Sequence, residues 1–111
     1  MKIRSILSIV STVLFLGAAA AEEQSVRILA PADGSHFTVQ GPNQLSYEAV
    51  ASKGSHVHIY VDDKEVASLH HSKGDYIFKE LAPGSHKVCV KLANKAHVAM
   101  GAEQCIQVTV E

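Results

Sequence analysis

Short runs of alternating apolar and polar residues fill the chain from Val26 to its end. In His56–Val61, for example, every second side chain is aliphatic, and clusters such as Pro83–Ser85 interrupt these runs. Period-two alternation predicts strands with one buried face. About seven such strands, with turn signals roughly every 8–12 residues, are typical of an antiparallel sandwich. The sequence therefore predicts an all-β fold, an immunoglobulin-like antiparallel β-sandwich of about seven strands.

The expected strands follow directly from these runs. They lie at Val26–Leu29, Leu45–Ala49, His56–Val61, Glu65–Leu69, Tyr76–Leu81, His86–Leu92 and Cys105–Val110, with a further short piece at His36–Val39. The segment His70–Asp75 is expected to form a loop because its polar residues and glycine are typical of turns.

The first 21 residues have the three parts of a secretory signal peptide. Lys2 and Arg4 give a basic start, Ile6–Leu16 is largely apolar, and Gly17–Ala21 ends in alanines. A membrane anchor is the less favoured alternative, because a spanning helix needs about 20 apolar residues. We therefore expect cleavage after Ala21, a domain covering residues 22–111, a periplasmic or secreted location, and no membrane association after cleavage.

The charge balance restricts the partners of this domain. The 111 residues include 10 Lys+Arg and 11 Asp+Glu, for a net charge of −1. Nucleic-acid binders usually carry an excess of basic residues on one face, so a nucleic-acid partner is not expected. The length fits one domain, and an apolar share of 47% argues against intrinsic disorder.

Cys89 and Cys105 are the two cysteines of the chain. Both occupy polar positions of alternating runs, so in an antiparallel hairpin they would face each other across a connection of about nine residues around His97. A Cys/His metal site is the less favoured alternative, because thiols outside the cytosol rarely stay reduced. The sequence therefore predicts a Cys89–Cys105 disulfide that joins two neighbouring strands.

Three segments carry a resemblance to a known family. They read His-x-His-Ile-Tyr-Val-Asp at 56–62, Leu-Ala-Pro-Gly-Ser-His at 81–86, and Leu-Ala-Asn-Lys-Ala-His at 92–97. About half of the chain thereby resembles a bacterial family of small exported immunoglobulin-like domains of unknown function. Asn94 departs from the acidic residue expected there, and the cysteine pair is not part of the pattern. The resemblance implies the fold and export, but no chemical activity.

Seven histidines are the compositional feature that points to a function. The sandwich topology brings the loops that carry most of them to one end of the domain. At that end we expect His56, His58, His70, His71, His97 and Met100, and at the other end His36 and His86.

A metal site is the more specific interpretation of the histidines and Met100 that are expected together at one end of the domain. His56 and His58 lie two residues apart on one strand, so both rings point to the same side. Imidazole binds zinc and copper(II), and methionine sulfur favours copper(I). We expect an exported copper or zinc carrier or buffer whose ligands are His56, His58, His97 and Met100.

Other interpretations stay open beside it. The histidines of the expected site can be solvated surface residues, Met100 can fill a gap in the core, and His86 can donate to a turn carbonyl. The domain can then serve protein–protein interaction, or act as a structural module of the periplasm.

Catalysis is not expected. Ser85–His86 and Asp62–Asp63 supply a nucleophile and acids, but no pattern groups a nucleophile, a base and an orienting residue. The sequence also has no glycine-rich phosphate loop and no Cys-x-x-Cys redox pair. The sequence therefore predicts a binding domain and not an enzyme.

Overall fold

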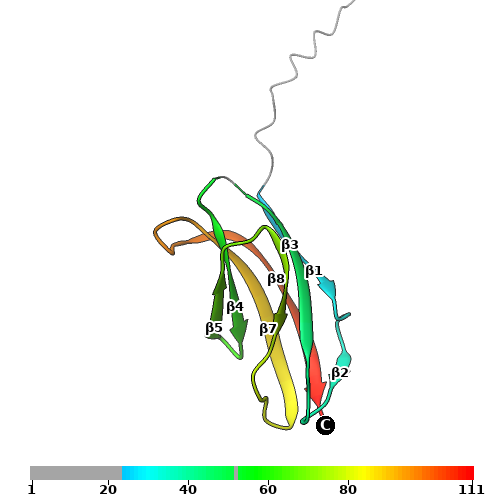
Figure 1. Cartoon of the computed structure of the whole chain (residues 1–111). Coiled ribbons are helices and arrows are strands. Elements are labelled where there is room, and N and C mark those ends of the chain that lie inside the picture. Colours follow the sequence, from blue (N-terminus) through cyan, green and yellow to red (C-terminus); the bar gives the residue numbers. More distant parts are fainter. Residues whose placement is uncertain (1–23, 52) are drawn as a thin grey trace, which may run out of the picture.

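The computed structural model describes residues 24–51 and 53–111, and all regular secondary structure in them is β (Figure 1). The predicted signal peptide lies outside the described residues. Within them, no helix is long and apolar enough to cross a membrane. The strands are β1 (Ser25–Ala30), β2 (Ser35–Phe37), β3 (Gln44–Val50), β4 (His56–Val61), β5 (Lys64–Leu69), β6 (Lys73–Ile77), β7 (Gly84–Ala93) and β8 (Ala99–Val110).

These strands form two sheets that pack face to face. One sheet has the order β1-β3-β6, and the other has the order β2-β8-β7-β4-β5. The predicted immunoglobulin-like β-sandwich is confirmed, with eight strands in place of about seven. The eighth is β2, a three-residue strand that overlaps the short piece expected at His36–Val39. It pairs with the end of β8 in parallel, so the pairing is not antiparallel throughout. Phe37 at the end of β2 is buried in the core.

The core lies between the sheets and consists of the alternate aliphatic and aromatic positions that the sequence marks. In β4, Val57, Ile59 and Val61 face this core, so His56 and His58 point to the outer face of the five-stranded sheet. The largest fully buried side chains are Tyr47, Leu45, Ile59, Leu92, Val57, Val88, Val90, Val108 and Val110.

Strand β6 begins earlier than predicted. It starts inside the expected loop His70–Asp75 and ends before the expected end at Leu81. Gly74 of β6 is paired with Tyr47 of β3, and a Cβ atom at Gly74 would lie 3.1 Å from the Tyr47 hydroxyl oxygen. That hydroxyl donates a hydrogen bond of 2.9 Å to the His71 carbonyl. The glycine that reads as a loop signal therefore allows the close approach of a buried tyrosine in a strand.

The β7–β8 hairpin sets the geometry of the site. Cys89 and Cys105 are directly paired across it and form a disulfide with their Cα atoms 4.0 Å apart. The strands run further than predicted, so the connection covers residues 94–98 in place of about nine residues. Figure 1 shows the tip of this hairpin at the same end of the sandwich as the start of β4 and the end of β5, opposite the C-terminus.

His86 lies at the opposite end of the sandwich, where both of its ring nitrogens are hydrogen-bonded. Its Nδ1 lies 2.5 Å from a carboxylate oxygen of Asp62, and its Nε2 lies 2.6 Å from the Ala82 carbonyl oxygen. Both partners are acceptors, so the ring is fully paired when it carries two protons. The Asp62 carboxylate raises the pKa of His86, and the ring in turn lowers the pKa of Asp62. The predicted contact between His86 and a turn carbonyl is confirmed.

Replacing His86 by glutamine is expected to lower the free energy of unfolding by about 1 kcal/mol more at pH 5 than at pH 9. The folded pKa of His86 lies above its ordinary value of 6.5, and that of Asp62 lies below 3.8. The pair is therefore fully formed between these two values, and its stabilisation is lost as the pH rises through the raised pKa of His86. Urea unfolding at both pH values measures the difference, with His71→Gln as the control. An equal loss at both pH values contradicts it.

Candidate functional site

His56 and His58 lie on the outer face of the five-stranded sheet but are almost completely buried. Their exposed fractions are 3% and 6%. Their cross-strand partners on β7 are Ala93 and Lys91, and the ring of His97 lies beside both histidines, with centroids 4.3 and 5.3 Å away. The connection that carries His97 therefore folds back over β4 and helps to cover the two rings.

Three imidazole nitrogens converge under this connection. Nε2 of His56 lies 2.9 Å from Nδ1 of His97, and Nε2 of His58 lies 3.3 Å from the same atom. The candidate ligand atoms of the three histidines all lie within 4.8 Å of one another. Two metal–nitrogen bonds of about 2.0–2.1 Å at a tetrahedral angle hold their nitrogens about 3.3–3.4 Å apart. The two separations to His97 Nδ1 are close to this value, whereas the widest separation in the group, up to 4.8 Å, has to shorten for one ion to be bound by all three.

Glu65 of β5 holds His58 in the tautomer that a metal needs. Its carboxylate oxygen lies 2.9 Å from Nδ1 of His58, so Nδ1–H donates to it, and Nε2 of the same ring faces Nδ1 of His97 at 3.3 Å. A carboxylate behind a ligating imidazole orients the ring and increases its basicity. The sequence interpretation did not include Glu65, because it lies on another strand, past a bulge between Ile59 and Tyr60.

His56 is a buried, neutral ring. Burial lowers its pKa most, and the neighbouring rings of His97, His58 and His70 lower it further, whereas the Gly54 carbonyl has a smaller opposite effect. Its Nδ1 is buried and has no hydrogen-bond partner of good geometry among the described residues. The hydrogen-bond partner of the ring among the described residues is instead another imidazole, since its Nε2 faces His97 Nδ1 at 2.9 Å.

His97 reaches the cluster because the hairpin connection has a fixed local structure. Its backbone is in the left-handed region, with φ +62°. The side-chain oxygen of Asn94 accepts hydrogen bonds of 2.9 and 3.0 Å from the backbone N–H groups of Ala96 and Val98. Asn94 is a second site residue that the sequence interpretation did not assign, although asparagine is a known turn former that bonds to the backbone two residues further on.

Met100 is the fourth ligand that the sequence predicts. Its sulfur lies 3.6 Å from the Ser55 hydroxyl oxygen, which donates to it, and its side chain packs against the core. The preceding residue, Ala99, pairs with Ala93 on the outer face, so alternation turns Met100 to the inner face. The expected ligand Met100 is therefore placed with the core and not with the imidazoles.

The remaining histidines divide as expected between the two ends. The ring of His70 lies 4.8 Å from that of His56, at an interplanar angle of 31°, and His71 is exposed beside it. At the other end, His36 lies 3.4 Å from the carboxylate of Glu111. The converging imidazoles are those of His56, His58 and His97, and His70 is a neighbour of this cluster.

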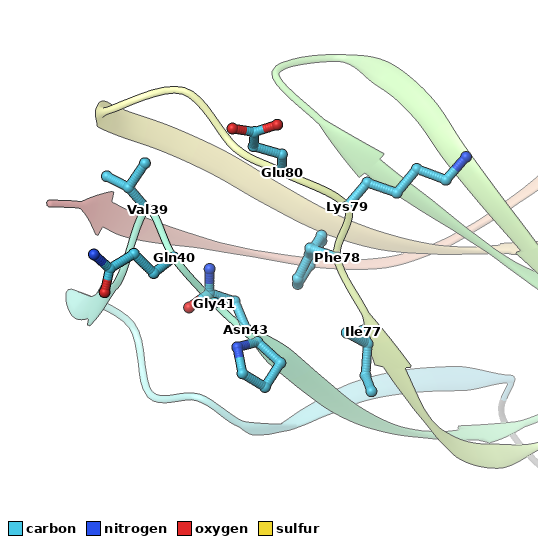
Figure 2. A pocket seen from close by; sticks show the side chains of 9 residues that line it. Val39, Gln40, Gly41, Asn43, Ile77, Phe78, Lys79 and Glu80 are labelled. Atoms are coloured by element: carbon cyan, nitrogen blue, oxygen red, sulfur yellow. The ribbon is translucent and has the colours of Figure 1, made fainter.

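A groove of about 580 Å³ lies elsewhere on the domain (Figure 2). Figure 2 shows the side chains of Val39 and Ile77 on its rim, and Ile77 is 59% exposed. Its lining residues are Val39, Gln40, Gly41, Pro42, Asn43, Ile77, Phe78, Lys79 and Glu80. This lining contains no histidine or cysteine, so it offers no imidazole or thiolate ligand to zinc or copper.

Solved structures support the fold. The chain resembles the fibronectin(III)-like modules of Clostridium thermocellum CbhA, with 21% identity, a TM-score of 0.61, and coverage of 78% of this chain and 96% of the module. It also resembles part of the endo-beta-1,4-mannanase from Thermotoga petrophila, with 12% identity and a TM-score of 0.59. That match covers 82% of this chain but 20% of the mannanase, so it concerns one part of the enzyme. These similarities show the sandwich fold alone.

No curated protein matches the chain in sequence. A family model does match it over residues 43–111, which is more than half of its length and includes all three converging histidines. The chain therefore belongs to DUF6130, a family of unknown function.

Proposed function

We propose that this protein is an exported carrier or buffer of a divalent metal ion, zinc or copper(II). The observation that carries the proposal is the convergence of nitrogens from His56, His58 and His97 within 4.8 Å. Two of these ligands stand on the rigid strand β4, and a carboxylate orients one of them. The signal-like first 21 residues and the disulfide support an oxidising, exported location.

The chemistry of the three ligands favours the divalent ions. Copper(I) prefers thioether or thiolate sulfur, and the Met100 sulfur lies against Ser55 and the core. Imidazole nitrogens suit zinc and copper(II), and copper(II) is the tighter binder of the two in most sites. Three protein ligands also leave a coordination position open, as in zinc sites that exchange a ligand. His97 is exposed, so an ion can enter and leave past its ring.

Calorimetric titration of the tag-free exported protein with zinc and with copper(II) tests the proposal. We expect one ion per chain, with a Kd below about 1 µM, which corresponds to a free energy of about −8 kcal/mol. The control is a double variant, His36→Asn with His71→Asn, which removes two exposed histidines outside the group and keeps the affinity. Binding that is no tighter than that of a pair of surface histidines contradicts the proposal.

Replacing Glu65 by glutamine is expected to weaken zinc binding about 10-fold, at the lower end of the effects of outer-shell changes. The amide oxygen still accepts the hydrogen bond from His58, but it lacks the negative charge that makes the ring a stronger ligand. Competition against a zinc chelator measures the ratio of Kd values. Glu103→Gln is the matched control, because Glu103 pairs with Lys91 on the neighbouring strands. An unchanged affinity for Glu65→Gln shows that the carboxylate has no such role.

Protein recognition is a second candidate function, favoured by the groove of Figure 2. Its rim exposes the aliphatic side chains of Val39 and Ile77, which are 36% and 59% exposed. Co-purification from the exported fraction distinguishes the two functions. A specific partner that is retained in the presence of a chelator, and released by Ile77→Asp, favours recognition over metal carriage.

A further inference from the structure

Asn94 makes four hydrogen bonds within the hairpin connection. Its side-chain oxygen accepts from the N–H groups of Ala96 and Val98, at 2.9 and 3.0 Å. Its own N–H donates to the Val98 carbonyl at 3.0 Å, and its carbonyl accepts from the N–H of His97 at 2.9 Å. One residue thus binds the backbone on both sides of His97.

These bonds fix a backbone conformation that His97 does not favour by itself. A non-glycine residue with φ near +62° is uncommon, because its Cβ is crowded by the backbone. The hydrogen bonds to Asn94 hold Ala96 and Val98, the residues before and after His97. His97 therefore has little freedom to leave the left-handed region of φ. In this conformation its Nδ1 lies 2.9 Å from His56 Nε2 and 3.3 Å from His58 Nε2.

We propose that Asn94 is the positioning residue of the metal site. The assignment rests on the proposed metal-binding function and goes beyond it, because it names the residue that determines whether the site has two ligands or three. His56 and His58 are held by β4 in any case, whereas His97 stands on a connection of five residues, 94–98. Without the side chain of Asn94, binding must itself order this connection, and this cost offsets the gain from the third bond, so that the ion is held by His56 and His58 alone.

The test compares Asn94→Ala with Asn94→Asp in the full chain. A carboxylate at this position offers the same acceptor oxygens to Ala96 and Val98, so it should rescue what alanine removes. We expect zinc binding to weaken by more than about 100-fold in Asn94→Ala, as on removal of the His97 ligand itself, and by less than about 3-fold in Asn94→Asp. Val98→Ala, which trims an exposed side chain in the same connection, is the matched control and should keep the wild-type affinity.

The copper(II) EPR spectrum supplies a readout that a general loss of stability does not change. We expect hyperfine coupling to three nitrogens in the wild type and in Asn94→Asp, and to two in Asn94→Ala, at a temperature where all three are folded. Asn94→Leu, which keeps the size of the side chain but has no acceptor, replaces the alanine variant if the latter does not fold. Three nitrogens and wild-type affinity in the alanine or leucine variant overturn this assignment alone. Absence of metal binding in the wild type overturns the proposed function together with it.

Discussion

Replacing His97 by asparagine is expected to weaken zinc and copper(II) binding by more than about 100-fold, which exceeds the effect of an outer-shell change. The variant removes one of three nitrogens and leaves His56 and His58 in place on β4. Asparagine is chosen because it tolerates the left-handed backbone, here with φ +62°, better than alanine does. Calorimetry or chelator competition measures the loss.

The same substitution at His36 is the matched control, because that exposed histidine lies at the other end of the sandwich beside Glu111. We expect wild-type affinity there, and wild-type thermal stability for both variants to within a few degrees. Equal affinities of His97→Asn and the wild type would show that the ion is bound elsewhere.

Replacing both cysteines by alanine is expected to lower the free energy of unfolding by about 3 kcal/mol. The disulfide joins residues 16 positions apart, and closing a loop of this length removes much of the entropy of the unfolded chain. For a domain of this size the melting temperature should fall by roughly 10–20 °C. Alanine is preferred to serine, because Cys89 is 2% exposed and a hydroxyl there would be buried.

Reduction of the wild-type protein provides the control for this prediction. A reductant should bring the melting temperature of the wild type close to that of the double variant, and it should leave the double variant itself unchanged. A wild-type protein whose melting temperature is insensitive both to reduction and to Cys89→Ala with Cys105→Ala contradicts the structural role of the disulfide.

The sequence predicts the strands well where alternation is strong and one face is buried. Val57, Ile59 and Val61 mark β4, and the register that puts Cys89 opposite Cys105 follows from two such runs. The prediction from sequence fails at Gly74. A glycine there indicates a loop by residue type, but in the structure it belongs to a strand and allows the close approach of a tyrosine ring. Local patterns do not report such contacts between strands that are distant in the sequence.

The candidate site, too, could be predicted from the sequence only in part. His56 and His58 could be predicted to share a face, because the spacing of two residues determines it. Met100 was expected beside them, and the pairing of Ala99 with Ala93 turns it to the other face. Glu65 could not be predicted, since its contact with His58 depends on the sheet order β7-β4-β5 and a bulge in β4–β5 pairing.

X-ray absorption together with anomalous diffraction on the zinc-loaded protein addresses the central claim most directly. We expect one ion per chain, bound at about 2.0–2.1 Å by imidazole nitrogens of His56, His58 and His97, with a non-protein ligand in the remaining position. An ion bound instead by His70 and His71, or one held by fewer than all three of the converging rings, would contradict this expectation.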